Sequence, residues 1–190
     1  MRKSFLIGCS VVALVISQSA QADELKLRSF MDGATENPAV PTDGMGTSLV
    51  TFDLDLLTMR VQASFSDLTG TTSAAHIHCC ADPPTNVGVA TQLPSFLGFP
   101  LGVMAGSMDT TFDMTLASSY NPAFVTANTN IDGAFNALLN GLVDGRAYFN
   151  IHTSFRSGGE IRGYYTVVPE PSCAMLLLLG AAGFVVRRRR

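Results

Sequence analysis

A regular alternation of apolar and polar residues limits what this chain can fold into more than any other feature. From 47 to 56, and again from 59 to 65, apolar residues take every second position. Side chains two apart lie on the same face of a β-strand, whereas a helix repeats every 3.6 residues. Leu57 and Thr58 provide a short connection between the two segments. We therefore expect two strands that pair and bury one face in a core.

The rest of the domain has mostly the same character, with one exception. Further strands are expected at 25–30, 72–78, 108–116, 146–153 and 160–167, with Gly, Pro, Asp and Asn between them. Residues 131–143 instead repeat apolar side chains at helical spacing, with Asp132 as a candidate cap and Gly145 at the end. The sequence predicts a mostly β protein: an antiparallel β-sandwich or barrel of immunoglobulin-like size with one short helix.

The N-terminal segment predicts export. A short basic stretch precedes an apolar run from 5 to 16, and Ala20 and Ala22 give the small-x-small pattern cleaved by signal peptidase. We expect residues 1–22 to be a signal peptide and residues 23–167 to form the β domain. A lipoprotein cleavage box ending at Cys9 is the alternative, but most of the apolar run follows it.

The C-terminal segment also carries a targeting pattern. Pro169, Glu170 and Pro171 precede an apolar segment at 172–186, and four arginines follow it. As a transmembrane helix this segment would span about 22 Å, less than the hydrocarbon core of about 30 Å. The order of these parts closely resembles the PEP-CTERM sorting signal, which an exosortase of the Gram-negative inner membrane recognises and removes.

The resemblance to PEP-CTERM implies that residues 168–190 are a sorting tail. The protein would lie transiently at the periplasmic face of the inner membrane, then at the cell surface or in the extracellular matrix. Signal peptidase and an exosortase-type enzyme are the expected processing partners. Proteins of this kind are often associated with exopolysaccharide and biofilm, so an exopolysaccharide or envelope partner is expected. A simple C-terminal membrane anchor is the alternative.

The charge of the domain argues against nucleic acid as a partner. Residues 23–167 contain 14 acidic and 6 basic side chains, which gives a net charge of −8. Phosphate backbones are bound by clustered Lys and Arg, which this segment lacks. An acidic balance suits a soluble exported protein or the binding of cations.

The histidines and cysteines suggest a metal site. His76 and His78 share one face of an expected strand, and His152 lies on another, so three imidazoles converge if the two strands are neighbours. Three ring nitrogens with an open position suit Zn²⁺ or Cu²⁺. Glu160, Cys79 and Cys80 are candidate fourth ligands. The alternative is a half-exposed polar face whose rings bond to backbone or water, with the neighbouring cysteines paired to each other.

Three motifs together resemble the CHRD domain, a module first recognised in chordin and common in bacterial secreted proteins. They are Ala75-His76-Ile77-His78, the run 147–153 (Ala-Tyr-Phe-Asn-Ile-His-Thr) and Gly159-Glu160-Ile161-Arg162-Gly163. The resemblance covers about residues 25–166 and implies an extracellular module of β character. After the first motif, Cys79-Cys80 stands where a Gly-rich turn is usual.

Two functions remain in view from sequence. The first is an exported, non-enzymatic protein of the cell envelope or extracellular matrix, because no catalytic motif is found. The alternative is a small secreted metal-binding protein that holds Cu or Zn through His76, His78 and His152 and that could be redox-active.

Overall fold

Seven strands form one antiparallel sheet in the computed structural model, which describes residues 24–169. The strands are β1 (Glu24–Asp32), β2 (Met45–Asp53), β3 (Thr58–Ser66), β4 (Thr72–Cys79), β5 (Gly106–Asp113), β6 (Ala147–Thr153) and β7 (Ile161–Val167). Their order in the sheet is β4-β6-β7-β1-β2-β3-β5, with every neighbouring pair antiparallel. The predicted mostly β class is confirmed.

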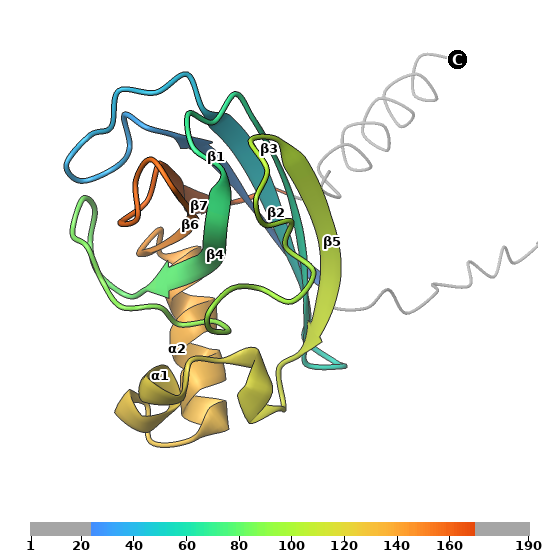
Figure 1. Cartoon of the computed structure of the whole chain (residues 1–190). Helices are drawn as coiled ribbons and strands as arrows, with labels where there is room; N and C mark the ends of the chain where they lie inside the picture. Colours follow the sequence, from blue (N-terminus) through green and yellow to red (C-terminus); the bar gives the residue numbers. More distant parts are fainter. Residues whose placement is uncertain (1–23, 170–190) are drawn as a thin grey trace, which may run out of the picture.

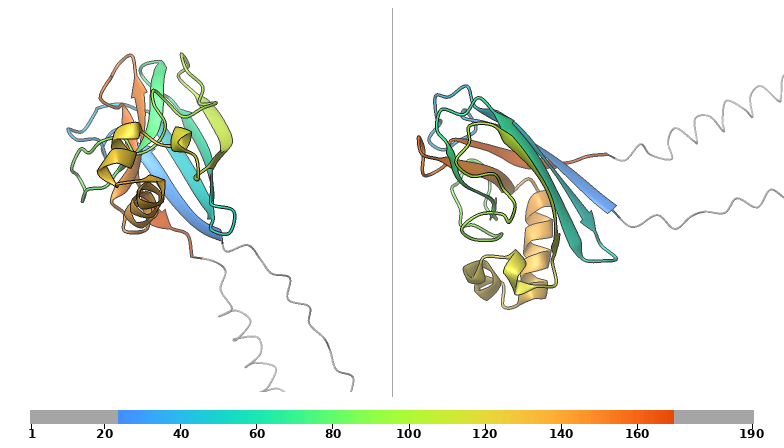
Figure 2. Two further views of the ribbon diagram at one scale, coloured as in Figure 1. Left: turned by 90° about the horizontal axis from the view of Figure 1, so that it is seen from below. Right: turned by 45° about the vertical axis from the view of Figure 1, so that its right-hand side comes forward.

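The sheet curls into a half-barrel (Figure 1). β4 and β5 are its two ends, so the expected sandwich or barrel takes the form of a single open sheet. The helices lie on the inner side of the curl, where α2 packs against β4, β6 and β7 (Figure 2). A strongly twisted sheet of this size buries its inner face only when another element fills the concavity, and α2 does so.

The apolar residues of the predicted alternation form the buried inner face of β1, β2 and β3. Leu27, Val50, Phe52, Met59 and Val61 are fully buried, while the side chains between them face the outside. The β2–β3 register pairs Val50 with Val61 and Phe52 with Met59. Each of these two residue pairs removes apolar surface from water on the same side of the sheet. This burial stabilises the observed register over one shifted by a single residue, which would turn the apolar side chains outward.

β4 and β6 are buried on both faces, unlike β1, β2 and β3. Their inner residues, such as Ile77 and Phe149, belong to the hydrophobic core. Their other face is polar and is covered by the β1–β2 loop (residues 33–44) and the loop after β4 (residues 80–105), as the side-chain contacts described below show. This face holds the histidines.

The predicted helix is confirmed as α2 (Ile131–Val143). Asn130 caps it, because its side chain accepts a 2.8 Å hydrogen bond from the Gly133 N–H, so the assignment of the cap to Asp132 was wrong. Gly145 follows the helix at φ +70°, the left-handed conformation that favours glycine. The 3₁₀ turn η1 (Ala117–Ser119) and the short α1 (Pro122–Ala127) had no periodic signal.

The described segment begins and ends side by side, since the Val168 N–H donates to the Lys26 carbonyl at 2.8 Å. No helix within residues 24–169 is long and apolar enough to cross a membrane. The expected apolar tail helix, the cleavage residues Ala20 and Ala22, and Glu170 and Pro171 lie outside the described residues. Pro169, the last described residue, is exposed.

Candidate metal centre

Three histidines from two neighbouring strands meet on the polar face of the sheet. β4 pairs with β6 so that Ala74 lies opposite His152 and His76 lies opposite Asn150. All three histidines therefore point to the same side of the sheet, and His152 lies one diagonal step from His76. One ring nitrogen from each histidine lies within 4.8 Å of the other two. The expected convergence of the three rings is thus present in the structure.

The closest contact in the cluster joins two ring nitrogens. Nε2 of His76 and Nε2 of His152 are 2.9 Å apart, and the ring centroids of His78 lie 5.2 Å and 5.8 Å from those of His76 and His152. Nitrogens about 2.0 Å from a tetrahedral zinc ion would be about 3.3 Å apart. The 2.9 Å pair is closer than this value, and the three ligand nitrogens all lie within 4.8 Å of one another, so movements of the rings by about 1–2 Å would bring them to zinc-binding distances.

Two backbone carbonyls fix the orientation of the rings. The His78 Nδ1–H donates to the Val87 carbonyl at 2.7 Å, and the His152 Nδ1–H donates to the Ser157 carbonyl at 2.8 Å. A carbonyl can only accept, so Nδ1 carries the proton and Nε2 of each neutral ring keeps a lone pair. Metal-binding histidines are usually held in this way.

The hydrogen bonds leave two buried ring nitrogens without a partner among the described residues. The first of these nitrogens is Nε2 of His78. Because Nε2 of neutral His152 accepts, His76 must donate from Nε2, and its Nδ1 is the second nitrogen without a partner. A buried unpaired acceptor costs about 1–3 kcal/mol. A cation among the three Nε2 atoms would accept the lone pairs of His78 and His152, and that of His76 once its proton moves from Nε2 to Nδ1.

All three rings are held in the neutral form that binds metals. Burial lowers the pKa of His76 to about 3, reinforced by His152 and His78. Burial also lowers the pKa of His78 to about 4, against the effect of its bond to Val87. The pKa of His152 is lowered for the same reason, against its bond to Ser157. Protons therefore do not compete for these nitrogens at neutral pH.

Glu160 does not belong to the cluster, so its prediction as a fourth ligand was wrong. Both oxygens of its carboxylate are occupied: Oε1 accepts from the hydroxyl of Thr42 (2.7 Å) and the N–H of Thr69 (2.6 Å), and Oε2 from the N–H of Gly70 (3.1 Å) and the hydroxyl of Thr153 (2.6 Å). Burial alone would raise its pKa, but these bonds together hold the pKa below its usual value. Glu160 joins three segments of the fold.

Cys79 and Cys80 are also absent from the cluster, because the alternation of β4 turns Cys79 away from His78 and towards the core. The two sulfurs form a disulfide with each other. They lie against Ala137 and Gly141 of α2 on the inner side of the sheet, where Gly141 leaves room for them. The prediction of either thiol as a ligand was wrong.

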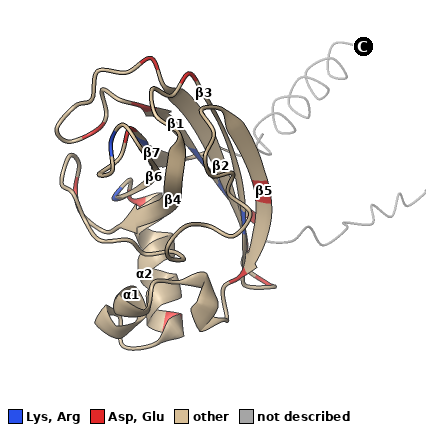
Figure 3. Ribbon diagram, in the orientation of Figure 1, with Lys and Arg blue, Asp and Glu red and all other residues tan. Residues whose placement is uncertain are grey.

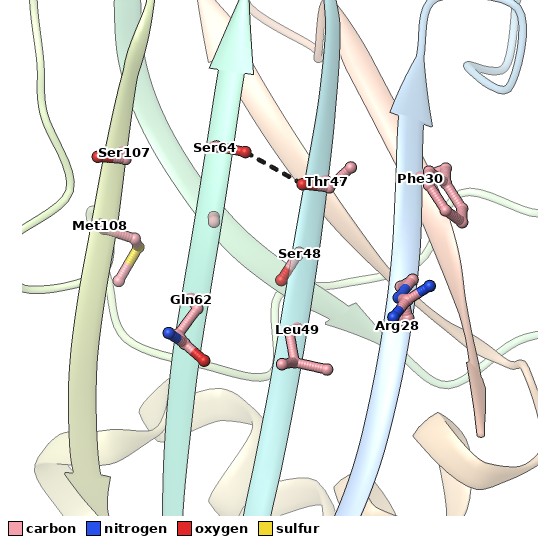
Figure 4. Close-up of a pocket in the computed structure, with 10 residues that line it drawn as sticks. Arg28, Phe30, Thr47, Ser48, Leu49, Gln62, Ser64, Ser107 and Met108 are labelled. Carbon is pink, nitrogen blue, oxygen red and sulfur yellow. Dashed lines mark hydrogen bonds between the residues drawn. The ribbon is translucent and has the colours of Figure 1, made fainter. Parts of the chain in front are cut away.

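Sequence reasoning missed Val87 and Ser157, which orient two of the three rings. Both act through backbone carbonyls, which every residue has, so no side-chain pattern could have identified them. A hollow of about 560 Å³ on the sheet also had no sequence signal. It is an open trough across β1, β2, β3 and β5, and the histidines do not line it (Figure 4). Arg28 is its only charged lining residue.

Stability of the metal-free protein is expected to fall as the pH drops from 7 to 5. The folded pKa values of His76 and His78 lie below the unfolded value of about 6.5, so the unfolded state takes up protons first. Each histidine should contribute a loss of about 2 kcal/mol in the free energy of unfolding. Urea unfolding at both pH values, in chelator, measures the loss for wild type and for His76→Gln. An equal loss in both proteins would contradict the burial of a neutral His76.

Glu160→Gln is expected to lower the free energy of unfolding by about 2–4 kcal/mol, because the amide N–H group would face backbone donors and leave them unpaired. Glu24→Gln, at a more exposed carboxylate, is the matched control and should change it by less than about 0.5 kcal/mol. Chemical denaturation of both variants measures the difference. A loss no larger than that of Glu24→Gln would show that the four hydrogen bonds are not stabilising.

Comparison with known proteins assigns the two parts of the chain. The family model of the CHRD domain matches residues 27–165, and that of the PEP-CTERM protein-sorting motif matches residues 167–190. The sorting motif implies export and processing by an exosortase-type enzyme. No curated protein and no solved structure matches the chain. The first match spans most of the chain, and the protein belongs to the CHRD domain family.

Proposed function

We propose that this protein is an exported, non-enzymatic metal-binding component of the cell envelope or extracellular matrix. In this proposal, residues 1–22 are removed as a signal peptide, residues 23–167 form the functional domain and residues 168–190 are the sorting tail. The sorting motif supports the export step. The resemblance to signals read by exosortases supports a Gram-negative host, and we propose the cell surface or matrix as the final location.

One observation supports metal binding: three imidazoles, two of them buried and that of His152 half-buried, bring ring nitrogens within 4.8 Å of one another. Backbone carbonyls hold His78 and His152 in the tautomer whose Nε2 has a lone pair. Neutral nitrogens held this way repel one another unless a proton or a cation lies between them. Imidazole ligands suit Cu²⁺ and Zn²⁺, and three of them leave a fourth position for water or another ligand. We assign His76, His78 and His152 as the ligands.

We propose a binding role for the ion rather than a catalytic one. Within residues 24–169, the group of potential ligands contains imidazoles alone, and the carboxylate of Glu160 is hydrogen-bonded elsewhere. Three imidazoles and an open position can also activate a bound water for hydrolysis, but such catalysis requires a substrate pocket beside the ion. The histidines do not line the open trough across β1, β2, β3 and β5, which favours the non-enzymatic role.

Charge supports a cation rather than a phosphate polymer as the partner. Residues 24–169 contain 13 acidic and 6 basic side chains, and the basic ones are scattered in Figure 3. One of the six, Arg162, is buried in an ion pair. The envelope partner is therefore proposed to be a neutral or cation-bridged exopolysaccharide, not nucleic acid.

The processed, untagged protein should bind one Zn²⁺ or Cu²⁺ ion per chain after stripping with chelator and reloading. The ligands are the only three histidines of the chain, so His76→Gln/His78→Gln should bind less than about 0.2 ion per chain. Elemental analysis after gel filtration measures the stoichiometry. Glu160→Gln is the control and should keep the full ion, because that carboxylate is not a ligand.

Circular dichroism checks that each variant is folded before its metal content is compared. Wild-type protein that retains neither Zn²⁺ nor Cu²⁺ after reloading and gel filtration would contradict metal binding. The histidines would then be a hydrogen-bonded structural cluster, as the alternative read from the sequence holds.

A further inference from the structure

A buried ion pair lies on the same face as the histidines. Arg162 Nε and Glu36 Oε2 are 2.7 Å apart, with side-chain exposures of 2% and 3%. The register of the sheet places His76, Asn150 and Arg162 in one row across β4, β6 and β7. Burying both charges costs several kcal/mol of desolvation, and such pairs often add little to stability compared with apolar residues. The position of this ion pair beside the histidine cluster points to a role in orienting the histidine rings.

Arg162 reaches His78 through an aromatic ring. Its guanidinium carbon lies 4.6 Å from the ring centroid of Tyr148, within the range of a cation–π interaction. The Tyr148 ring in turn stacks on the His78 ring, with centroids 4.8 Å apart and an interplanar angle of 6°. The guanidinium thus holds Tyr148, and Tyr148 covers one face of the His78 ring.

Arg162 also reaches His78 through the covering loop. Its Nη2 donates to Asn86 Oδ1 at 2.7 Å and to the Asn37 carbonyl at 3.3 Å, which ties the two covering loops together. The next residue, Val87, accepts the 2.7 Å bond from His78 Nδ1, and its N–H donates to Tyr148 Oη at 3.3 Å. The ring plane and the ring rotation of His78 are therefore fixed by the same guanidinium.

We propose that Arg162 and Tyr148 are positioning residues for the metal centre. The Glu36–Arg162 pair holds Tyr148 and the Val87 loop, and these two hold the His78 ring so that Nε2 faces the other two histidines. Neither residue touches the ion. This inference rests on the proposed function and explains why a buried ion pair lies beside three neutral imidazoles.

Tyr148→Leu should weaken Zn²⁺ binding by about 10- to 100-fold, the usual effect of removing a partner that orients a ligand. Tyr148→Phe keeps the stacked ring and loses only the bond to Val87, so its affinity should stay within about 3-fold of wild type. Tyr165→Leu is the matched control: Tyr165 is a buried tyrosine whose hydroxyl bonds to Ser48, outside the cluster. The Tyr165→Leu variant should be less stable to unfolding but should keep the Zn²⁺ affinity of wild type.

Competition with a chromophoric chelator measures each affinity, and the electron paramagnetic resonance spectrum of bound Cu²⁺ reports the ligand geometry. The double variant Glu36→Gln/Arg162→Gln removes both charges without leaving one unpaired, and it provides the test if Tyr148→Leu does not fold. We expect about 10-fold weaker Zn²⁺ binding and a changed copper spectrum. Arg162→Lys keeps a cation near the ring and should be intermediate.

The two proposals fail in different ways. Wild-type protein that binds no ion overturns the metal site and this inference with it. Wild-type protein that binds an ion, together with a Tyr148→Leu or double variant of unchanged affinity and spectrum, overturns the positioning role alone. An equal loss of affinity in Tyr165→Leu would also overturn it, because the effect would then be general destabilisation.

Discussion

The pairing of β4 with β6 is the constraint on which the rest of the structure depends. These strands are far apart in the sequence, and their register sets His152 diagonally beside His76. A one-residue slip would turn the histidines into the core and expose Ile77 and Phe149, which are fully buried. The same register that closes the hydrophobic core therefore assembles the histidine cluster.

The two-sided burial of these strands has a cost that the polar face must offset. Buried polar groups need hydrogen bonds or an ion, since each unpaired group costs about 1–3 kcal/mol. Glu160 meets this requirement with four protein donors. Arg162 meets it in part, through Glu36 and Asn86, while its Nη1 has no partner among the described residues. The histidines do not, because Nδ1 of His76 and Nε2 of His78 lack partners. These two unpaired ring nitrogens are the observation on which the proposed metal site rests.

The sequence predicted the features that depend on local periodicity. The alternation from 47 to 65 gave β2 and β3, the helical spacing gave α2, and the shared face of His76 and His78 followed from strand geometry alone. It could not show that Glu160 is consumed by backbone donors from a distant loop, or that Cys79 faces α2. Long-range pairings decide both. The carbonyls of Val87 and Ser157 carry no side-chain signal, so the orientation of the rings appeared only in the structure.

The central claim is that Nε2 of all three histidines binds one ion while Nδ1 carries the proton, which requires His76 to change tautomer when the ion binds. Long-range ¹H–¹⁵N correlation spectra of the imidazole rings in the Zn²⁺-loaded protein test this claim directly, because the nitrogen shifts separate protonated, free and metal-bound atoms. The account predicts a proton on Nδ1 and a metal-bound Nε2 in His76, His78 and His152. A proton that remains on Nε2 of any of the three at full zinc loading would contradict it.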